Sequence, residues 1–498
     1  MGYLFLTGST GLLGSYLIRD LLRAGVRLAV LARSSRVANA RHRIESQMHR
    51  WEKQAGKALP RPVVFEGDIT RPNLGLNEAD LAWVKENVTS FMHNAASLTF
   101  QAESPESEPY ISNVTGTQNV LDVCRVSGIR EFFHVSTAYV AGMRTDRVME
   151  SELDVGQKHG NDYEISKFRS ETMVREAEFL DKVTVYRPGI ILGDSRDGYT
   201  ATFHGFYVPL KLISTSIKQT ASLAKTPEEL EMWVRAGADR LRSVMSMDGS
   251  ESKYFVPVDW VSAAMTQIFI NPEHHEKTYH LTPREPVSIA MVQRVLEDIS
   301  LEYGAKSSST GPPIDWDNFE RTFLEGMTVY KSYWNNDPQY DCTNVITALP
   351  ELPCPQVDEK MLQLMCRYAL DVNFGWPMQP VVKPAFDVED HLKAVHQETP
   401  APGSGSLSLG LRVTGQGGGE WELKMNEGRL VSVQPGIGSR CTATYFLNSK
   451  TFSQIASHPE SAYQGINTGR ILVEGNGVPL EQLTQFLQNL AEKKLPPV

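Results

Sequence analysis

The sequence predicts an α/β protein built on a doubly wound parallel sheet, followed by a smaller α+β domain. Two observations in the first half of the chain support the sheet. The chain begins with a short apolar stretch, a glycine-rich loop and an amphipathic helical stretch. Apolar strands and helical stretches then alternate through residue 189, which is the pattern of a parallel sheet. Ligands of such sheets bind at the carboxyl ends of the strands.

Length and composition set broad limits. A chain of 498 residues is too long for one core and suggests two to three domains. Its net charge of −10 argues against a nucleic-acid partner. No apolar run approaches the roughly 18 residues of a membrane helix, so we expect a cytoplasmic protein without a transmembrane segment. The five cysteines lack CxxC spacing, which predicts neither a disulfide framework nor a metal site.

The first strand is expected at residues 3–7, and Gly8, Gly11 and Gly14 follow it at intervals of three. In a nucleotide-binding unit the first glycine permits a tight turn, and the second lets the backbone approach a pyrophosphate. The third allows close packing of helix and strand. Because the anion lies on the helix N-terminus, the predicted dinucleotide site also includes Thr10, Leu12 and Leu13.

A second strand, at residues 26–32, ends where such folds bind the adenosine ribose. An NAD enzyme carries an acidic residue there, whereas this strand is followed by Arg33 and two serines. A guanidinium suits the 2′-phosphate of NADP, and Arg43 in the next helical stretch could join it. The sequence therefore favours NADPH. The alternative is that Arg33 is only a solvated loop charge.

Further strands are expected at 63–65, 90–93, 132–135 and 183–186, with a helix at 113–124. Small residues after these strands would let the backbone approach a cofactor. After the strand at 63–65, the carboxylate or the backbone of Asp68 could contact the adenine. The remaining candidate cofactor residues are Asp68, Ile69, Asn94, Ala95, Ala96, Asn113, Ser136, Pro188 and Gly189.

Tyr163 and Lys167 are four residues apart and share one face of a helix. A phenol has a pKa near 10, and we expect the ammonium of Lys167 to lower it. Tyr163 is then the acid that protonates a carbonyl oxygen as hydride reaches the carbon. Thr137, after a neighbouring strand, gives that oxygen a second hydrogen bond. These three residues are the predicted catalytic group.

Several stretches resemble a known enzyme family: TGSTGLLG, HNAASLTF, NVTGTQNVL, VSTAYVAG, YEISKFRSE and YRPGIILGDS. Residues 1–270 resemble the NADP-binding Rossmann domain of an extended short-chain dehydrogenase/reductase. Within that group they are most similar to fatty acyl-CoA reductases and thioester reductases, with their male-sterility-like NAD-binding domain. The resemblance implies NADPH and an acyl thioester on coenzyme A or an acyl carrier protein. The implied products are an aldehyde and, after a second reduction, an alcohol.

Residues 195–390 are expected to form an interleaved substrate-binding lobe rich in aromatic side chains. One predicted helix carries Val292 and Ile299 on one face, and another carries Met361 and Met365. Between the two halves of this lobe, residues 256–259 are expected to return to the edge of the sheet.

Residues 391–407 are expected to form a linker and residues 408–498 a separate α+β domain with a last helix at 480–490. The linker contains Gly-Ser-Gly-Ser at 403–406, so we expect it to leave the two parts free to move. The domain resembles sterol-carrier-protein domains, which shelter an acyl or sterol chain. The stretches that carry this resemblance are 421–423, 426–428, 442–444, Phe452, Ile455, Ala456 and 469–475. The alternative is a dimerisation or packing domain.

Three functions are compatible with these residues. The leading hypothesis is an NADPH-dependent reductase of a lipid-like acyl thioester. A second is a dehydrogenase or reductase of a sterol or sugar ketone with the same catalytic residues. The third is a non-enzymatic lipid carrier that senses the cofactor ratio, but the intact Thr137, Tyr163 and Lys167 argue against it, since a sensor needs no acid.

Overall fold

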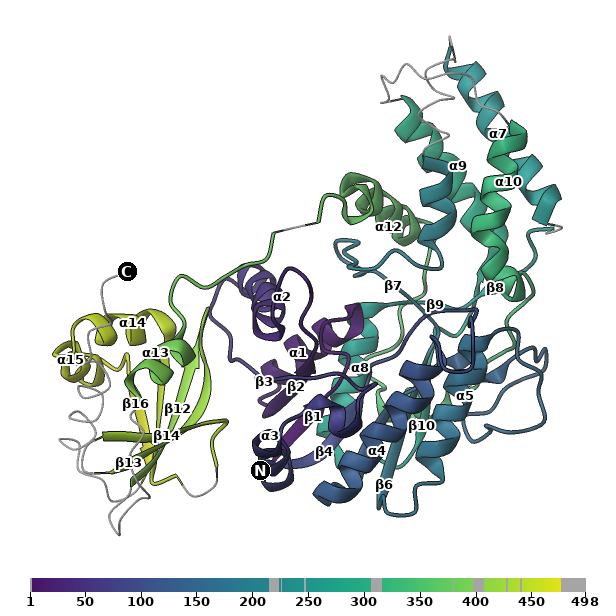
Figure 1. Ribbon diagram of the computed structural model, residues 1–498. Helices are drawn as coiled ribbons and strands as arrows, with labels where there is room; N and C mark the ends of the chain where they lie inside the picture. Colours follow the sequence, from purple (N-terminus) through teal and green to yellow (C-terminus); the bar gives the residue numbers. More distant parts are fainter. Residues whose placement is uncertain are drawn as a thin grey trace.

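A parallel sheet forms the centre of the amino-terminal part in the computed structural model (Figure 1). The structure describes residues 2–214, 224, 226–245, 248–305, 316–378, 380–396, 407–426, 429–438 and 441–475. Within these ranges seven strands pair in the order β3-β2-β1-β4-β5-β6-β10. They are β1 (Tyr3–Leu6), β2 (Leu28–Ala32), β3 (Val63–Glu66), β4 (Val88–His93), β5 (Glu131–Val135), β6 (Lys182–Pro188) and β10 (Thr278–Leu281). The first six confirm the predicted strands.

Helices cover both faces of this sheet, so the predicted doubly wound α/β fold is confirmed. Alternate residues of β1 point to opposite faces, as strand geometry requires. Leu4 and Leu6 pack with α1, α2 and α8, whereas Tyr3 and Phe5 belong to a second core with α3 and α4. The helices of this part are α1 (Leu12–Arg23), α2 (Ala40–Ala55), α3 (Glu78–Asn87), α4 (Gly116–Ser127), α5 (Asp162–Arg175), α8 (Val258–Ile270) and α11 (Thr343–Ala348). Shorter helical turns are η1 (Pro72–Gly75), η2 (Ile111–Thr115), η3 (Ala138–Ala141) and η4 (Pro272–His274).

The expected return of residues 256–259 to the sheet edge is wrong. β9 (Phe255–Pro257) pairs with β7 (Ile190–Leu192) in a separate two-stranded sheet, and α8 begins at Val258. The edge strand on this side of the sheet is β10, which pairs with β6. Its sequence, TYHL, alternates polar and apolar residues, although all four are buried.

A helical lobe projects from the sheet near the carboxyl ends of its strands (Figure 1). Its main elements are α7 (Pro227–Met245), α9 (Ile289–Ala305), α10 (Trp316–Met327) and α12 (Glu359–Asp371). α9 and α12 are the two helices predicted in this region, and their apolar faces share one core. Shorter elements of the lobe are β8 (Ser252–Lys253), β11 (Val287–Ser288), η5 (Thr328–Tyr333) and η6 (Asn373–Gly375).

The carboxyl-terminal module, which we define as residues 386–475, has a hydrophobic core of its own. Its five-stranded sheet has the order β14-β13-β12-β15-β16. The strands are β12 (Leu407–Thr414), β13 (Gly419–Asn426), β14 (Arg429–Pro435), β15 (Ala443–Asn448) and β16 (Leu472–Gly475), and the helices are α13 (Val388–Val395), α14 (Ser449–Ser457) and α15 (Ser461–Asn467). Across the described ranges, every helix is too short or too polar to span a bilayer.

The expected linker at 391–407 is wrong at its beginning, because α13 occupies residues 388–395. Val388 and Leu392 of this helix are fully buried in the core of the module. The remaining linker residues 397–406, residues 427–428 and the predicted helix at 480–490 lie outside the described residues.

The carboxyl-terminal module is docked against the sheet domain. The Tyr3 hydroxyl donates a hydrogen bond to Glu420 Oε2 at 2.7 Å and accepts one from the Ile437 backbone N–H at 2.9 Å. Tyr3 and Glu420 are both buried. The Gly415 N–H donates to the Leu59 carbonyl at 3.1 Å. The expectation that the two parts move freely is therefore wrong for this structure, since buried polar groups join them.

Candidate functional site

The glycine loop after β1 has the geometry that a nucleotide-binding turn requires. Gly8 has a φ of +68°, and a Cβ there would lie 2.7 Å from the Ala95 nitrogen. A Cβ on Gly14 would lie 2.1 Å from the Gly8 carbonyl oxygen, so any side chain would push α1 away from the loop. Gly11, the N-cap of α1, has only the Gly8 carbonyl near its missing Cβ, at 3.4 Å. The loop therefore leaves its helix N-terminus open to an anion.

A cavity of about 730 Å³ extends from this loop into the helical lobe. It is lined by every predicted catalytic and cofactor residue except Gly14, Asp68 and Asn113. The sequence placed most of these residues at strand ends, and the parallel sheet brings those ends to one edge. The predicted residues thus share one continuous space.

The three exceptions support the walls of the cavity. Gly14 permits the close approach of α1 to the loop. Asp68 accepts hydrogen bonds from the Thr70 N–H and hydroxyl at 3.0 and 2.9 Å. Asn113 accepts a bond from the Ser97 N–H at 2.7 Å and donates to Ser166 Oγ at 2.9 Å, which ties the loop after β4 to α5.

Two arginines mark the end of the cavity beside β2. Arg43 donates to Thr10 Oγ1 at 3.0 Å and to the Arg33 carbonyl at 2.6 Å, so it bridges the glycine loop and the end of β2. Burial and the neighbouring guanidinium of Arg33 lower the pKa of Arg43. The Arg33 side chain is 64% exposed and lies 3.6 Å from an Asp68 oxygen. Two cations held this close favour an anion at this position.

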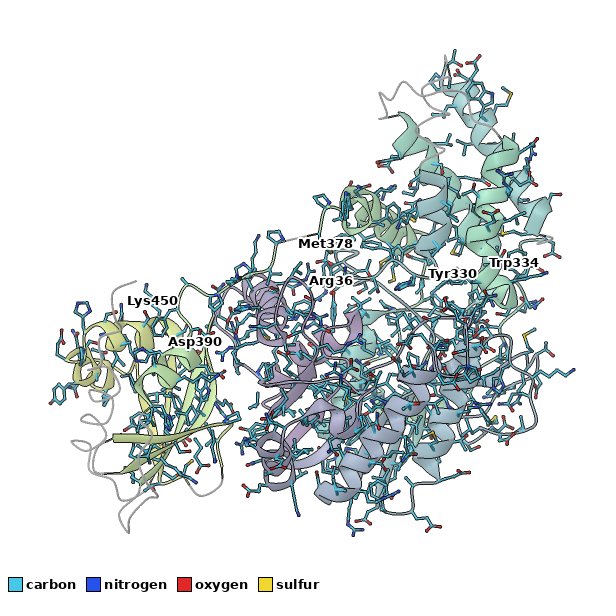
Figure 2. All side chains as sticks on the ribbon, viewed as in Figure 1. Arg36, Tyr330, Trp334, Met378, Asp390 and Lys450 are labelled. Atoms are coloured by element: carbon cyan, nitrogen blue, oxygen red, sulfur yellow. The ribbon has the colours of Figure 1, made fainter. Side chains whose placement is uncertain are left out.

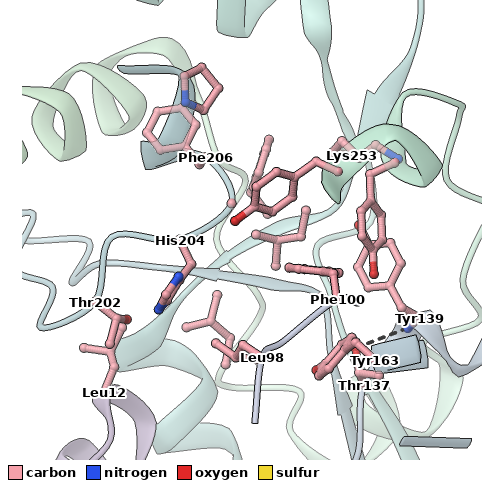
Figure 3. Close-up of a pocket in the computed structure, with 18 of the residues that line it drawn as sticks. Leu12, Leu98, Phe100, Thr137, Tyr139, Tyr163, Thr202, His204, Phe206 and Lys253 are labelled. Carbon is pink, nitrogen blue, oxygen red and sulfur yellow. Dashed lines mark hydrogen bonds between the residues drawn. The ribbon is translucent and has the colours of Figure 1, made fainter. Parts of the chain in front are cut away.

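The three predicted catalytic residues all line the cavity, and Figure 3 shows Thr137 next to Tyr163. Asn161 caps α5 and thereby sets the start of the helix that carries Tyr163 and Lys167. Thr137 follows β5, where its hydroxyl accepts a hydrogen bond from the Tyr139 N–H at 3.3 Å. Lys167 donates to the Val135 carbonyl at 2.7 Å, and burial lowers its pKa to about 8.

The expected lowering of the Tyr163 pKa is wrong in this structure. Burial raises that pKa to about 12, and the hydrogen bond with Thr137 only partly opposes it. The Lys167 ammonium points to a backbone carbonyl instead of the phenol. Tyr163 consequently keeps its proton at neutral pH, as a proton donor must.

An aromatic wall beside Tyr163 was not predicted. It consists of Phe100, Tyr139, Tyr330 and Tyr333, and Figure 3 shows Phe100 and Tyr139 close to Thr137 and Tyr163. The Phe100 ring centroid lies 5.6 Å from that of Tyr163 and 5.0 Å from that of Tyr330. Such tilted ring pairs contribute roughly 0.5–1.5 kcal/mol each beyond their burial.

A buried carboxylate holds this wall in place. Asp337 accepts hydrogen bonds from the Tyr139 hydroxyl at 2.8 Å, the Lys253 ammonium at 2.6 Å and the Tyr254 N–H at 3.0 Å. It therefore connects the end of β5, β8 and the segment after η5. No local pattern indicates this cluster, because Tyr139, Lys253 and Asp337 are each separated by more than eighty residues of sequence.

The far end of the cavity is mostly apolar and is built from the helical lobe, although Arg242 of α7 and Gln293 and Glu297 of α9 also line the cavity. Its lining includes Trp233, Ala238 and Leu241 of α7, Val292 and Leu296 of α9, and Phe323 of α10. Tyr330 and Trp334 lie at the base of this lobe (Figure 2). His204, Thr202 and Leu12 lie across the cavity from Tyr163 (Figure 3). A ligand can thus contact both the nucleotide loop and an apolar helical wall.

Comparison with known proteins agrees with this geometry. Residues 6–265 match the family model described as male sterility protein. The chain belongs to the male sterility protein family. Its amino-terminal part is accordingly an oxidoreductase domain of the type that binds a nicotinamide dinucleotide.

Two relatives and one solved structure illustrate the family. The chain is 26% identical over 301 residues, 57% of its length, to the nonribosomal peptide synthetase asaC of Aspergillus flavus. It is 24% identical over 338 residues, 60% of its length, to the fatty acyl-CoA reductase wat of Drosophila melanogaster. The terminal R domain of the myxalamid PKS-NRPS pathway is 25% identical, with a TM-score of 0.58, over 75% of this chain and 92% of that domain.

The chain spans only part of these curated relatives. The match covers 26% of asaC and 60% of the Drosophila reductase. The similarity therefore concerns about a quarter of the first relative and three fifths of the second.

Proposed function

We propose that this protein is an NADPH-dependent reductase of a lipid-like acyl thioester, which it converts to an aldehyde and then to an alcohol. The observation that carries this proposal is the single cavity that joins the glycine loop, the Thr137–Tyr163–Lys167 group and an apolar helical wall. A dinucleotide, a reactive carbonyl group and a hydrocarbon chain each have a matching part of this space.

The residues around the glycine loop fit NADPH. The N-terminus of α1 would bind the pyrophosphate, and Arg33 and Arg43 would bind the 2′-phosphate. Lys167 would hold the nicotinamide ribose, and the Tyr163 ring would lie beside it. When bound, NADPH supplies the hydride.

The catalytic group acts on the oxygen of the thioester carbonyl. Tyr163, which is protonated at neutral pH, donates a hydrogen bond to this oxygen and gives up its proton as the carbon is reduced. Thr137 donates a second hydrogen bond and stabilises the developing negative charge. The resulting hemithioacetal collapses to aldehyde and free thiol, with its hydroxyl proton passing to the leaving sulfur. A second reduction, to alcohol, would take a hydride from a second NADPH and a proton from Tyr163 after it has been reprotonated by solvent, and the same two residues would hold the aldehyde oxygen.

The apolar end of the cavity favours an acyl chain over a sugar. Each methylene withdrawn from water stabilises binding by about 0.8 kcal/mol, so long chains gain most from the lobe. The two relatives, a nonribosomal peptide synthetase and a fatty acyl-CoA reductase, support a thioester carried by an acyl carrier protein or by coenzyme A. We further propose that the carboxyl-terminal module shelters an acyl or sterol chain, as its sequence resemblance suggests.

The decisive experiment incubates the full chain with NADPH and a panel of substrates, followed by mass spectrometry of the products. The panel contains acyl-CoA and acyl-pantetheine thioesters from four to sixteen carbons and one ketosteroid. Aldehyde or alcohol from the thioesters, and none from a Tyr163→Phe variant, supports the proposal. Turnover of the ketosteroid alone would refute it.

A further inference from the structure

Helix α2 lies between the cofactor end of the cavity and the carboxyl-terminal module. Its residue Arg43 bonds to Thr10 and to the Arg33 carbonyl, at the position proposed for the 2′-phosphate. Arg41, two residues earlier, points to the other side, since residues two apart lie about 200° apart around a helix. Helix α2 thus contacts both the proposed 2′-phosphate site and the carboxyl-terminal module.

Arg41 contacts the carboxyl-terminal module through both of its terminal nitrogens. Its Nη2 lies 3.0 Å from Asp387 Oδ1, and its Nη1 pairs with Glu389. The same guanidinium lies 3.4 Å from the carbonyl oxygens of Gly417 and Gly418. Its side chain is only 21% exposed, so this ion pair is partly desolvated and stronger than a surface pair.

The partners of Arg41 are themselves fixed within the module. Asp387 is the N-cap of α13 and accepts hydrogen bonds from the N–H groups of Glu389 and Asp390. Val388, between them, is fully buried in the module core. A displacement of Arg41 relative to this anchor would therefore break several interactions together.

Other contacts hold the same helix along its length. The Val382 N–H donates to Ser46 Oγ at 3.0 Å, and His49 bonds to Gln416. Just beyond α2, the Gly415 N–H donates to the Leu59 carbonyl. The module thus contacts α2 at its first turn, at His49 and at the loop that follows the helix, and the segment just before the module adds the contact with Ser46.

We propose that the carboxyl-terminal module, acting through Arg41, positions Arg43 for the 2′-phosphate and so sets the preference for NADPH over NADH. Arg41 is a positioning residue that does not touch the cofactor. The inference rests on the proposed function, because it assumes that Arg43 binds this phosphate. Replacing Arg41 would let α2 shift, and the affinity for NADPH would fall while that for NADH, which lacks the phosphate, would not.

The test measures dissociation constants of NADPH, NADH and 2′,5′-ADP for the full chain by fluorescence titration and calorimetry. Arg41→Ala should weaken NADPH and 2′,5′-ADP about three- to tenfold and change NADH less than twofold. Glu389→Gln, on α13 in the module, should give a smaller change of the same kind. The double variant should bind NADPH no more weakly than Arg41→Ala does, because both substitutions remove the same Arg41–Glu389 ion pair. Lys53→Ala removes an exposed cation of the same helix and should leave all three constants unchanged.

Two results would overturn the inference while the proposed cofactor stands. One is unchanged NADPH affinity in Arg41→Ala and in Glu389→Gln, although Arg43→Ala loses it. The other is an equal loss for NADPH and NADH, which would mean that Arg41 only supports the fold. If Arg43→Ala itself affects both cofactors alike, the assignment of the 2′-phosphate to Arg43 fails and the inference fails with it. Glu389→Gln keeps the test valid if Arg41→Ala does not fold, since Glu389 is 31% exposed.

Discussion

Replacing Arg187 with methionine should destabilise the sheet domain, because it removes the main partner of a buried carboxylate. Arg187, in β6, and Glu171, in α5, are both completely buried. The Arg187 guanidinium donates to Glu171 at 2.7 and 3.1 Å and also to the Glu152 carbonyl at 2.7 Å. This pair anchors the catalytic helix α5 to the sheet.

The pKa of Glu171 gives the size of the effect. Burial alone would raise this pKa, but Arg187 and Arg175 lower it from 4.5 to about 2. One pKa unit corresponds to 1.36 kcal/mol, so the ionised carboxylate contributes about 3 kcal/mol at neutral pH. Because the folded-state pKa is the lower one, this stability is complete above pH 4.5 and is lost as the pH falls toward 2. Arg175 still contacts Glu171 at 2.7 Å, so we expect the loss at the lower end of the usual 3–5 kcal/mol.

Chemical and thermal unfolding at pH 7 measure this loss. About 3 kcal/mol should lower the melting temperature of the domain by about 6–12 °C. The control is Arg130→Met, whose pair with Asp181 is 61% and 63% exposed and should contribute less than about 1 kcal/mol. A loss below about 1 kcal/mol for Arg187→Met would refute the reasoning, as would a difference from the wild type that does not shrink below pH 4.5.

Three further predictions concern the cavity. Tyr163→Phe should lower kcat by about 10²- to 10⁴-fold and leave the dissociation constant of NADPH unchanged, because the ring still packs against Phe100 while the proton donor is lost. Cofactor binding should weaken as the pH rises through about 8, where Lys167 loses its charge, and a Lys167→Met variant should bind weakly at every pH in the same titration. Ala238→Trp should raise KM for a sixteen-carbon thioester and not for a four-carbon one, because the indole ring would fill the apolar end of the cavity. Steady-state kinetics with both substrates measure this difference.

The sheet and the residues at its strand ends could be predicted from the sequence because their signals are local. The run Tyr3–Leu6 and the glycines after it specify a strand, a turn and a helix within a few residues. β10 was missed because Thr278 and His280 look exposed in the sequence. In the structure His280 is buried, its ring bonds to the Asp341 carbonyl, and its N–H donates to Glu150. Partners from distant parts of the chain make these polar groups acceptable inside the protein. They are Asp341, in the segment after η5, Glu150, and Arg175, which donates to the Thr278 hydroxyl.

The aromatic wall and the docking of the carboxyl-terminal module could not be predicted for a related reason. Tyr139, Lys253 and Asp337 meet only after the sheet and the lobe have assembled. Tyr139 lies in the VSTAYVAG stretch, but no motif around Lys253 or Asp337 indicates that they contact it. Arg41 is one of several charged residues in a polar helical stretch, and its sequence neighbours do not indicate a partner. Its partner Asp387 lies hundreds of residues later, within a stretch whose composition gave no sign of a contact.

The spacing of Tyr163 and Lys167 shows how a correct motif can carry a wrong electrostatic expectation. Helical spacing of four residues puts both side chains on the cavity side of α5, as predicted. The spacing does not fix where the Lys167 ammonium points. In the structure this ammonium donates a hydrogen bond at 2.7 Å to the carbonyl of Val135, the last residue of β5. Burial is then the largest influence on both groups: it raises the pKa of Tyr163 to about 12 and lowers the pKa of Lys167 to about 8. At neutral pH the pair consists of a protonated phenol and a charged amine, so Tyr163 can act as an acid without being made more acidic first.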